Sequence, residues 1–436
     1  MRNSIKTFVN SILIIWLVSV PISTALAAEV QNIPQLFRES GAQTGTVLPG
    51  DSVITITHAL EKVALRNPQL KAARAAVSGA EGRLLQSRKL PNPNLSIEVA
   101  NFGRNSASGP QETTVGIIQP LELFGKRGAR KEIAFHLFEA QNLEYDQVSL
   151  KVYRETAIAY YSLLASQQIL KYSESQLELA RQVFDAVNIK VTDGAAPRSE
   201  LLRAESAVRL AEINVAEANA ELDRSRIALS MQWGEADTSI VATGELDWWL
   251  NTNLPQNYLA LLDSNKEIQT QAALLDASKA AVRLSRALGK PDIAVGAGYR
   301  RLHDEKQNGF LAWLSLPLPL FNRNQGGIAE AVSTVARNEA LVQFARIRIS
   351  GDLQSILKTL ENQRNRVTIL REKVLPPAEQ ALNEIDEAYR LGSQPYINVL
   401  DAQRTLAEIQ IQTIEALMAG VIAATEIEII LGQRLK

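Results

Sequence analysis

The sequence predicts a mainly α-helical protein with a small β part, in which one strand-and-helix plan is written twice. Three observations support this fold class. Glycines and prolines recur at matched positions 198 residues apart, two segments of about 66 residues have helical composition, and four short segments alternate along the chain. Each half is expected to run helix, strand, loop, strand, long helix, tight turn and helix.

The N-terminal stretch has the features of a secretory signal. Arg2 and Lys6 precede an apolar run over residues 12–20, and small residues follow up to Ala27. The run is shorter than the ~20 residues of a spanning helix, so cleavage after Ala27 is favoured over a membrane anchor. Residues 28–52 are expected to be a linker.

Composition narrows the class of protein. The chain has 436 residues and no cysteine, so an exported form has to be stabilised by packing without disulfides. A net charge of −1 provides no overall attraction for nucleic acid. After residue 27 no apolar stretch is long enough for a transmembrane helix, so any membrane crossing is expected to be made by strands.

The internal repeat sets the domain boundaries. The first repeat is expected at 53–235, a joint at 236–256 and the second repeat at 257–436. Five matched pairs lie 198 residues apart, and Pro120 and Pro317, 197 apart, are interpreted as a pair with one residue lost between them. The five pairs are Asn67 with Asn265, Pro93 with Pro291, Gly194 with Gly392, Pro197 with Pro395, and Gly234 with Gly432.

Each repeat contributes two predicted strands. They lie at about 93–102 and 112–120 in the first repeat and at about 291–301 and 309–319 in the second. Apolar residues alternate along them, and each has about the 9 to 11 residues that cross a bilayer when a strand is tilted. A helix is expected before the first strand pair, over residues 57–88.

The long helices are expected at about 126–191 and 325–391, and shorter partners at 198–231 and 396–431. At a rise of 1.5 Å per residue, a helix of this length is a rod of roughly 100 Å, which no globular core can contain. Heptad spacing in the first partner predicts close packing against the rod, with large residues alternating with alanines. These residues are Leu201, Val208, Val215, Leu222 and Leu229, with Ala204, Ala211 and Ala218 between them.

Glycine and proline mark the turns and junctions. Gly194 and Gly392 are expected to end the long helices, and Pro197 and Pro395 to begin the partners. At the exits of the strands, prolines are expected to end the ladder because they lack an N–H donor. The predicted strand-to-helix junctions are Pro120, Phe124 and Gly125 in the first repeat, and Pro317, Phe321 and the helix-capping Asn322 in the second.

Four strands cannot close a membrane barrel, because the smallest closed barrels have about eight. Open edges in lipid would leave backbone groups without hydrogen bonds. Several chains therefore have to share one barrel. Two copies would supply eight strands, and three would supply twelve.

Several segments resemble the TolC-type outer-membrane efflux proteins, the outer membrane factors, over essentially the whole mature chain. They are residues 67–84, 319–327 and 389–410. The amino-acid sequence of residues 119–131 is most similar to the branch of the family that serves cobalt, zinc, cadmium or copper-silver exporters. The resemblance implies a homotrimer whose 12-stranded transmembrane β-barrel is continued by a periplasmic α-helical barrel. It also implies the outer membrane of a Gram-negative bacterium, a periplasmic adaptor and an inner-membrane pump of the RND type.

The predicted function is a passive exit duct of a tripartite efflux system, with heavy-metal cations as cargo. A multidrug or protein export duct of the same architecture is the alternative, followed by a soluble periplasmic coiled-coil adaptor. The histidines His58, His136 and His303 are dispersed, and no nucleophile motif, phosphate loop or carboxylate pair is found in the sequence. No enzyme activity, cofactor or firmly bound metal is expected.

The resemblance assigns the closed mouth of the tunnel to the second hairpin. Asp401 and Asn398 match positions that are acidic in the family, and Asn398 departs from that pattern. Tyr389 matches a position that ties neighbouring coils. Two alternatives stay open, namely an ion pair between Asp401 and Arg404 at the start of the helix, and simple packing for Tyr389.

Three further groups have competing interpretations. The turns at Gly194, Pro197, Gly392 and Pro395 are expected to present the tips to the adaptor, or to be sharp turns only. A basic cluster opens the first long helix, as a lipid headgroup contact or a solvated collar. Trp248 and Trp249 in the joint are expected to dock against the outside of the tunnel, or to form an interaction surface. The cluster consists of Lys126, Arg127, Arg130 and Lys131.

Overall fold

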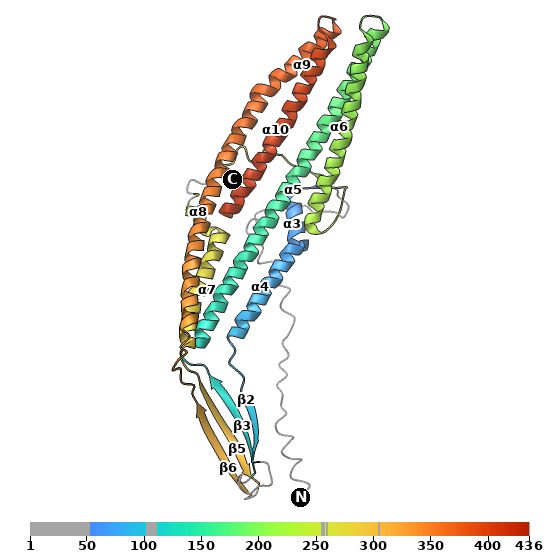
Figure 1. The fold of residues 1–436 in the computed structure, drawn as a ribbon. Coiled ribbons are helices and arrows are strands. Elements are labelled where there is room, and N and C mark those ends of the chain that lie inside the picture. Colours follow the sequence, from blue (N-terminus) through green and yellow to red (C-terminus); the bar gives the residue numbers. More distant parts are fainter. Residues whose placement is uncertain (1–52, 102–110, 254–257, 259, 304–305, 436) are drawn as a thin grey trace, which may run out of the picture.

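The protein is an elongated molecule in which long helices run away from one small sheet (Figure 1). The computed structural model describes residues 53–101, 111–253, 258, 260–303 and 306–435. The expected signal segment and linker lie outside the described residues. Figure 1 shows two helical hairpins side by side, with their tips at the end opposite the sheet.

The sheet has four antiparallel strands in the order β2-β3-β5-β6. They are β2 (Asn94–Ala100), β3 (Glu112–Leu121), β5 (Ile293–Leu302) and β6 (Gln307–Ser315). The two repeats meet where β3 pairs with β5. The fourth strand ends at Ser315, earlier than the expected 319. Its last pair is Ala294 with Ser315, and Pro317, two residues further on, has no N–H to donate.

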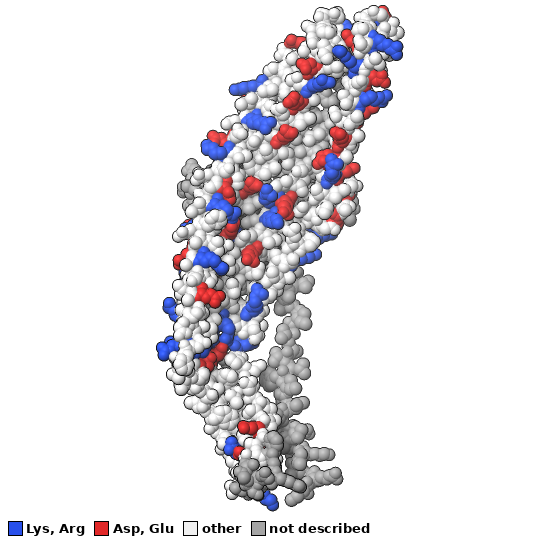
Figure 2. All heavy atoms as spheres, in the orientation of Figure 1, with Lys and Arg blue, Asp and Glu red and all other residues white. Residues whose placement is uncertain are grey.

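The two faces of this sheet differ in chemistry. One face carries exposed apolar side chains from all four strands, and the opposite face carries Glu98, Glu112 and Arg300, with an ion pair of 3.1 Å between the last two. Strand alternation separates the two sets. Figure 2 shows that charged side chains are sparse over the sheet and dense over the helices. The exposed apolar set includes Leu95, Ile97, Val99, Val115, Ile117, Val295, Tyr299, Phe310 and Leu314.

The first hairpin consists of α5 (Lys126–Thr192) and α6 (Arg198–Ser230). The alanines of the predicted heptad seam, Ala204, Ala211 and Ala218, are buried against α5. Small side chains at these positions let the two helix axes approach closely. The helix α6 is followed by a 3₁₀ turn, Met231–Trp233.

The second hairpin is less regular than predicted. Its first arm comprises α8 (Gln325–Ile369), one π-helical turn (Leu370–Val374) and α9 (Leu375–Arg390), and its second arm is α10 (Tyr396–Leu431). The expected uninterrupted helix over 325–391 was wrong in this respect. Two prolines in the first turn of α9 lack N–H donors, and the π turn accommodates the altered bonding.

Asparagine caps show the internal repeat at atomic detail. Asn67 caps α4 (Pro68–Ser87), with its Oδ1 accepting from the backbone N–H groups of residues 69 and 70, and its Nδ2 donates to Gln232 O. Asn265 caps α7 (Lys266–Leu288) in the same way and donates to Ile430 O. Because of the Asn67 and Pro68 pair, the helix expected over 57–88 is divided into α3 (Ile56–Arg66) and α4.

The joint between the repeats packs across the middle of the hairpins. Strand β1 (Val53–Ile54) pairs in parallel with β4 (Val241–Ala242), and a 3₁₀ helix spans Ala260–Ser264. Trp249 is fully buried, and a Cβ added to Gly420 of α10 would lie 1.8 Å from its ring. Trp249 therefore packs onto the helices, and its expected place on the outside of a tunnel stays a prediction.

None of the helices in the described ranges combines the length and the apolar composition that a membrane span requires.

Candidate functional site: strand-to-helix junction and hairpin tips

The first strand-to-helix junction is a tight bend made by two successive residues with left-handed backbones. Phe124 has φ 57° and Gly125 has φ 77°, and Gly125 is the N-cap of α5. Glycine adopts this conformation without the steric penalty that a Cβ would add. The bend lets β3 turn directly into the long helix α5.

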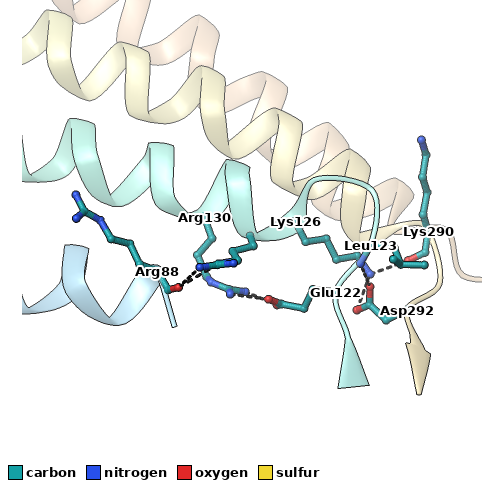
Figure 3. Close-up of polar contacts among 8 residues, drawn as sticks. Arg88, Glu122, Leu123, Lys126, Arg130, Lys290 and Asp292 are labelled. Atoms are coloured by element: carbon teal, nitrogen blue, oxygen red, sulfur yellow. Dashed lines mark hydrogen bonds and ion pairs between the residues drawn. The ribbon is translucent and has the colours of Figure 1, made fainter. Parts of the chain in front are cut away.

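Lys126 binds the two repeats together at this bend (Figure 3). Its side chain is only 6% exposed, and its Nζ lies 2.8 Å from Asp292 Oδ2 and donates to Lys290 O at 2.8 Å. Asp292 also accepts from the backbone N–H of Leu123 at 3.0 Å. A buried ammonium needs such partners, because an unpaired one would be strongly destabilising.

Two more members of the basic cluster have partners within the chain. Arg127 donates to Arg88 O at the end of α4, at 3.0 and 2.7 Å. Arg130 forms a bidentate ion pair with Glu122, and hydrogen bonding from this guanidinium lowers the pKa of the Glu122 carboxyl. These cations fasten β3, α4 and α5 to one another (Figure 3), and burial rules out a headgroup contact or solvated collar for Lys126. Arg127 and Lys131 are exposed, so for them both interpretations stay predictions.

Pro120 lies inside β3 rather than at its exit. It pairs with Ala294 of β5, and the strand continues for one more residue. The last residue of β3 paired with β2 is Ile118, so the missing N–H falls on the side where β2 has already ended. The expectation that Pro120 ends the ladder is thus correct for one neighbouring strand and wrong for the other.

The second junction differs from the prediction in its cap. The N-cap of α8 is Asn324, with φ 60°, and not Asn322. The Oδ1 of Asn322 accepts from the Asn324 N–H at 2.9 Å, and Asn324 Nδ2 donates to Ser285 O at 2.8 Å. Phe321 is 91% exposed, and Pro317 lies beyond the end of β6.

The two hairpin tips are built alike. In the first, Ala195 N–H donates to Lys190 O at 2.8 Å across Gly194, which has φ 72°. In the second, Ser393 N–H donates to Ala388 O at 2.9 Å across Gly392. Both turns are Schellman motifs, which need a left-handed residue at this point. Pro197 and Pro395 are the N-caps of the following helices, which begin at the expected residues 198 and 396, and both prolines and both glycines are exposed.

A polar and aromatic cluster joins the two tips within one protomer. The ammonium of Lys190 lies 4.0 Å from the ring centroid of Tyr389 and donates to Tyr389 O at the carboxyl end of α9. This position is favoured by the helix dipole and by the aromatic ring. Tyr389 Oη lies 3.5 Å from Glu200 of α6, and its ring centroid lies 5.7 Å from that of Tyr396.

Tyr389 and Tyr396 are nearly inaccessible in this cluster, at 3% and 2% exposed. Burial, together with the neighbouring Glu200, raises the pKa of Tyr389 to about 12. The phenol is therefore neutral at physiological pH and can donate a hydrogen bond. Within this chain Tyr389 packs and contacts the first hairpin, and its role at the mouth of the tunnel stays a prediction.

Asp401 stands apart from this cluster. Its side chain is exposed on α10, two turns after Pro395, and the described residues form no ion pair between Asp401 and Arg404. Asn398 is half-buried, and its amide donates to Gln394 Oε1 at 2.6 Å. The exposed carboxylate is available to a neighbouring chain or to the solvent.

No group of three or more histidine, aspartate or glutamate side chains in the described part of the chain could hold a metal ion. His136 pairs with Glu139 at 2.8 Å, and His303 lies 3.0 Å from Thr113 Oγ1. The three histidines are on separate elements.

Lys190 and Asp292 are among the contributors that were missed from the sequence. Lys190 lies four residues before Gly194, in the last helical turn, where a cation favours the carboxyl end. Asp292 follows Pro291, whose partner in the repeat is Pro93. Position relative to the repeated glycines and prolines is the signal that would have identified both.

The geometry agrees with three comparisons. The family model described as "Outer membrane efflux protein" matches residues 59–235 and 257–433, one match for each repeat. The cobalt-zinc-cadmium resistance protein CzcC of Cupriavidus metallidurans is 28% identical over 416 residues, 95% of this chain and 99% of the relative. The nickel and cobalt resistance protein CnrC of the same species is 26% identical over 79% of this chain and 76% of its own length.

A solved structure of CusC, described as forming a transmembrane channel, superposes with a TM-score of 0.78. It is 18% identical in sequence, and the match covers 87% of this chain and 92% of CusC. The duplicated strand and helical-hairpin fold is confirmed by this likeness.

Proposed function

Because the chain belongs to the outer membrane efflux protein family, we propose that it is the outer-membrane exit duct of a tripartite system that exports heavy-metal cations. The observation that carries the cargo class is the similarity to CzcC over nearly the full length of both chains. The chain would act passively, with the energy supplied by an inner-membrane pump of the RND type.

The sheet supports the membrane part of this proposal. One face is apolar and exposed in all four strands, which fits contact with lipid, and the opposite face carries charged groups, which fits a water-filled interior. Four strands per chain would give a closed barrel of twelve when three copies combine. The helical hairpins would then continue the duct into the periplasm.

The tips support the contact with an adaptor. Gly194, Pro197, Gly392 and Pro395 are exposed at the far end of the hairpins, and both turns share one backbone motif. An adaptor could therefore meet similar surfaces on both hairpins. Asp401, exposed near the same end, would line the mouth and attract cations without holding them, as a conduit requires.

Metal and drug tolerance of a deletion strain would test this function. We expect loss of the gene to sensitise cells to cobalt, zinc or cadmium and to raise cell-associated metal, and the wild-type gene to restore both. An empty vector is the matched control. Sensitivity to lipophilic drugs alone would favour the multidrug alternative, and unchanged tolerance to all compounds would contradict an efflux duct.

A further inference from the structure

The sheet has two open edges that are not equivalent in sequence. One edge is β2, and the other is β6 together with the segment that follows it, Leu316–Phe321. This segment alternates leucine with proline at Pro317 and Pro319. Proline is normally excluded from a paired strand because it lacks the donor.

Pro120 fixes the hydrogen-bond phase of the sheet. It lies opposite Ala294, and since it has no N–H it occupies a non-hydrogen-bonded position, so the residues on either side of it bond to β5. The N–H and C=O groups of one residue point toward the same neighbouring strand, and those of the next residue point toward the opposite one. The direction fixed at Pro120 therefore determines the direction at every paired residue of the sheet. In β6, the backbone N–H and C=O groups of odd-numbered residues point toward β5, and those of even-numbered residues point toward the open edge. In β2, the backbone groups of odd-numbered residues point toward its open edge.

The two prolines therefore remove donors from one side only. Pro317 and Pro319 are odd-numbered, so their missing N–H groups lie on the β5 side, where the last pair is Ala294 with Ser315. Continuing the same alternation past Ser315 assigns the N–H and C=O groups of Leu316 and Leu318 to the opposite, open edge. In the single chain Leu318 O accepts from Leu320 N–H at 2.9 Å, so outward pairing would replace this local bond. The segment lies beyond β6 in the single chain, and its prolines leave it the donors of a one-sided strand, closed to β5 and able to pair outward.

The internal repeat supplies the register of that outward pairing. Strand β5 follows β2 by 198 residues, as Pro93 and Pro291 show. Asn94 pairs with Ile118 in β2 and β3, and Ala294 pairs with Ser315 in β5 and β6. These two registers place β6 199 residues after β3. The helix N-caps Gly125 and Asn324 are separated by the same 199 residues, which corrects the offset of 197 expected from the prolines.

We propose that Leu316–Leu320 pairs with β2 of a second copy of this chain, in the register that β3 and β5 use within one copy. The pair Gln119 with Val295 within one chain corresponds to Leu318 opposite Ile97 of the second copy. In the same way, the pair Ile117 with Ala297 corresponds to Leu316 opposite Val99 of the second copy. This inference rests on the proposed ring of three chains and specifies how its seam is made.

Side-chain chemistry agrees with this register independently of the hydrogen bonds. Leu316 and Leu318 are 45% and 71% exposed, and Val99 and Ile97 are 43% and 66% exposed, in the single chain. Directly opposed residues of an antiparallel pair share a face, so the seam would bring these apolar side chains together on the lipid-facing surface. A slip by one residue would oppose polar and apolar faces instead.

Cysteine cross-linking tests the register directly, because the chain has no native cysteine. We expect Leu318→Cys with Ile97→Cys, treated with a short bifunctional thiol reagent, to give covalent dimers and trimers on denaturing gels. The repeat-equivalent pair Gln119→Cys with Val295→Cys should cross-link within one chain. The matched control Leu314→Cys with Ile97→Cys, shifted along the same face by four residues, should stay monomeric.

Two outcomes separate this inference from the proposed function. A native particle of three chains whose Leu318 and Ile97 cysteines do not cross-link, or cross-link no better than the shifted pair, would overturn the register alone. A native particle of one chain would overturn the ring as well.

Proline placement gives a second measurement that does not depend on cross-linking. Leu316→Pro removes a donor from the open edge, so we expect the trimer fraction on native gels to fall at least tenfold. Pro317→Ala restores a donor on the β5 side and should leave assembly unchanged. Equal assembly of the two variants would contradict a one-sided strand.

Discussion

Single residues hold the hairpins to the joint, and Gly420 is the sharpest case. A Cβ at this position would lie 1.8 Å from Trp249, which is fully buried. Bulk added to a packed core costs about 1–3 kcal/mol. The absence of a side chain at Gly420 therefore fixes where the joint crosses α10.

We expect Gly420→Ala to lower the free energy of unfolding by ~1–3 kcal/mol, because either Trp249 or α10 has to move. The measurement is thermal unfolding in detergent, followed by circular dichroism. Gly351→Ala is the matched control, since a Cβ there meets nothing within 4 Å. It should be neutral or stabilising by up to ~1 kcal/mol, because alanine favours helix over glycine. Equal effects of the two substitutions would refute the packing argument.

Glu428 is a buried carboxyl in the same region, at 3% exposed. Burial raises its pKa above the ordinary 4.5, while hydrogen bonds from Tyr153 Oη at 2.8 Å and Leu435 N–H at 3.0 Å act in the opposite direction. The folded state therefore binds the Glu428 proton more tightly than the unfolded state does.

The contribution of Glu428 to stability is present below its ordinary pKa and is lost as pH rises through the raised pKa of the folded state. We expect Glu428→Gln, which cannot titrate, to weaken the fall in melting temperature between pH 4.5 and neutrality. Glu426→Gln on the same helix is the control, because Glu426 is half-exposed and pairs with Arg154. An identical pH profile for wild type and Glu428→Gln would contradict this assignment.

At the scale of elements, the hairpin tips depend on a few contacts between α5, α6 and α9. Lys190 of α5 contacts the ring of Tyr389 and donates to Tyr389 O of α9, and removing its ammonium leaves Tyr389 O without that donor. The two hairpins are then held at this end mainly by apolar packing around Val187 and Val399.

We expect Lys190→Met to raise single-channel conductance in planar lipid bilayers several-fold, because loosened hairpins open the mouth. Lys171→Met is the control, since Lys171 lies on the same helix, exposed and further from the tip. Unchanged conductance for Lys190→Met in an assembled particle would show that this contact does not restrain the mouth.

Asp401 makes a separate prediction at the same end of the molecule. If three copies of this exposed carboxylate ring the mouth, Asp401→Ala should raise conductance and reduce cation selectivity by removing negative charge from the pathway. Asp386→Ala is the control, because Asp386 pairs with Arg390 on the neighbouring arm. Conductance and selectivity both equal to wild type would remove Asp401 from the mouth.

At the scale of the whole molecule, the spacing of apolar residues and the positions of glycine, proline and asparagine predicted the order of helices and strands well. Gly194 and Gly392 recur because the turns need a left-handed residue, and Asn67 and Asn265 recur because they cap helices. Both requirements depend only on neighbouring residues in the chain. The fold was predictable because each element carries its own start and stop signal.

The parts that sequence reasoning missed depend on partners distant in the chain. The basic cluster was expected to face lipid or solvent, yet Lys126 meets Asp292 only because β3 pairs with β5. Pro317 was expected to end the ladder, and the register of the neighbouring pair, Ala294 with Ser315, assigns its missing donor to the β5 side. Pairing between distant segments cannot be deduced from local propensity.

Electron cryo-microscopy of the assembly in lipid nanodiscs would show whether several chains form one duct. We expect three chains around one hollow axis, with twelve strands inside the lipid and the tips of all hairpins at the far end. A particle with another number of chains, or a four-stranded sheet lying outside the lipid, would contradict this expectation.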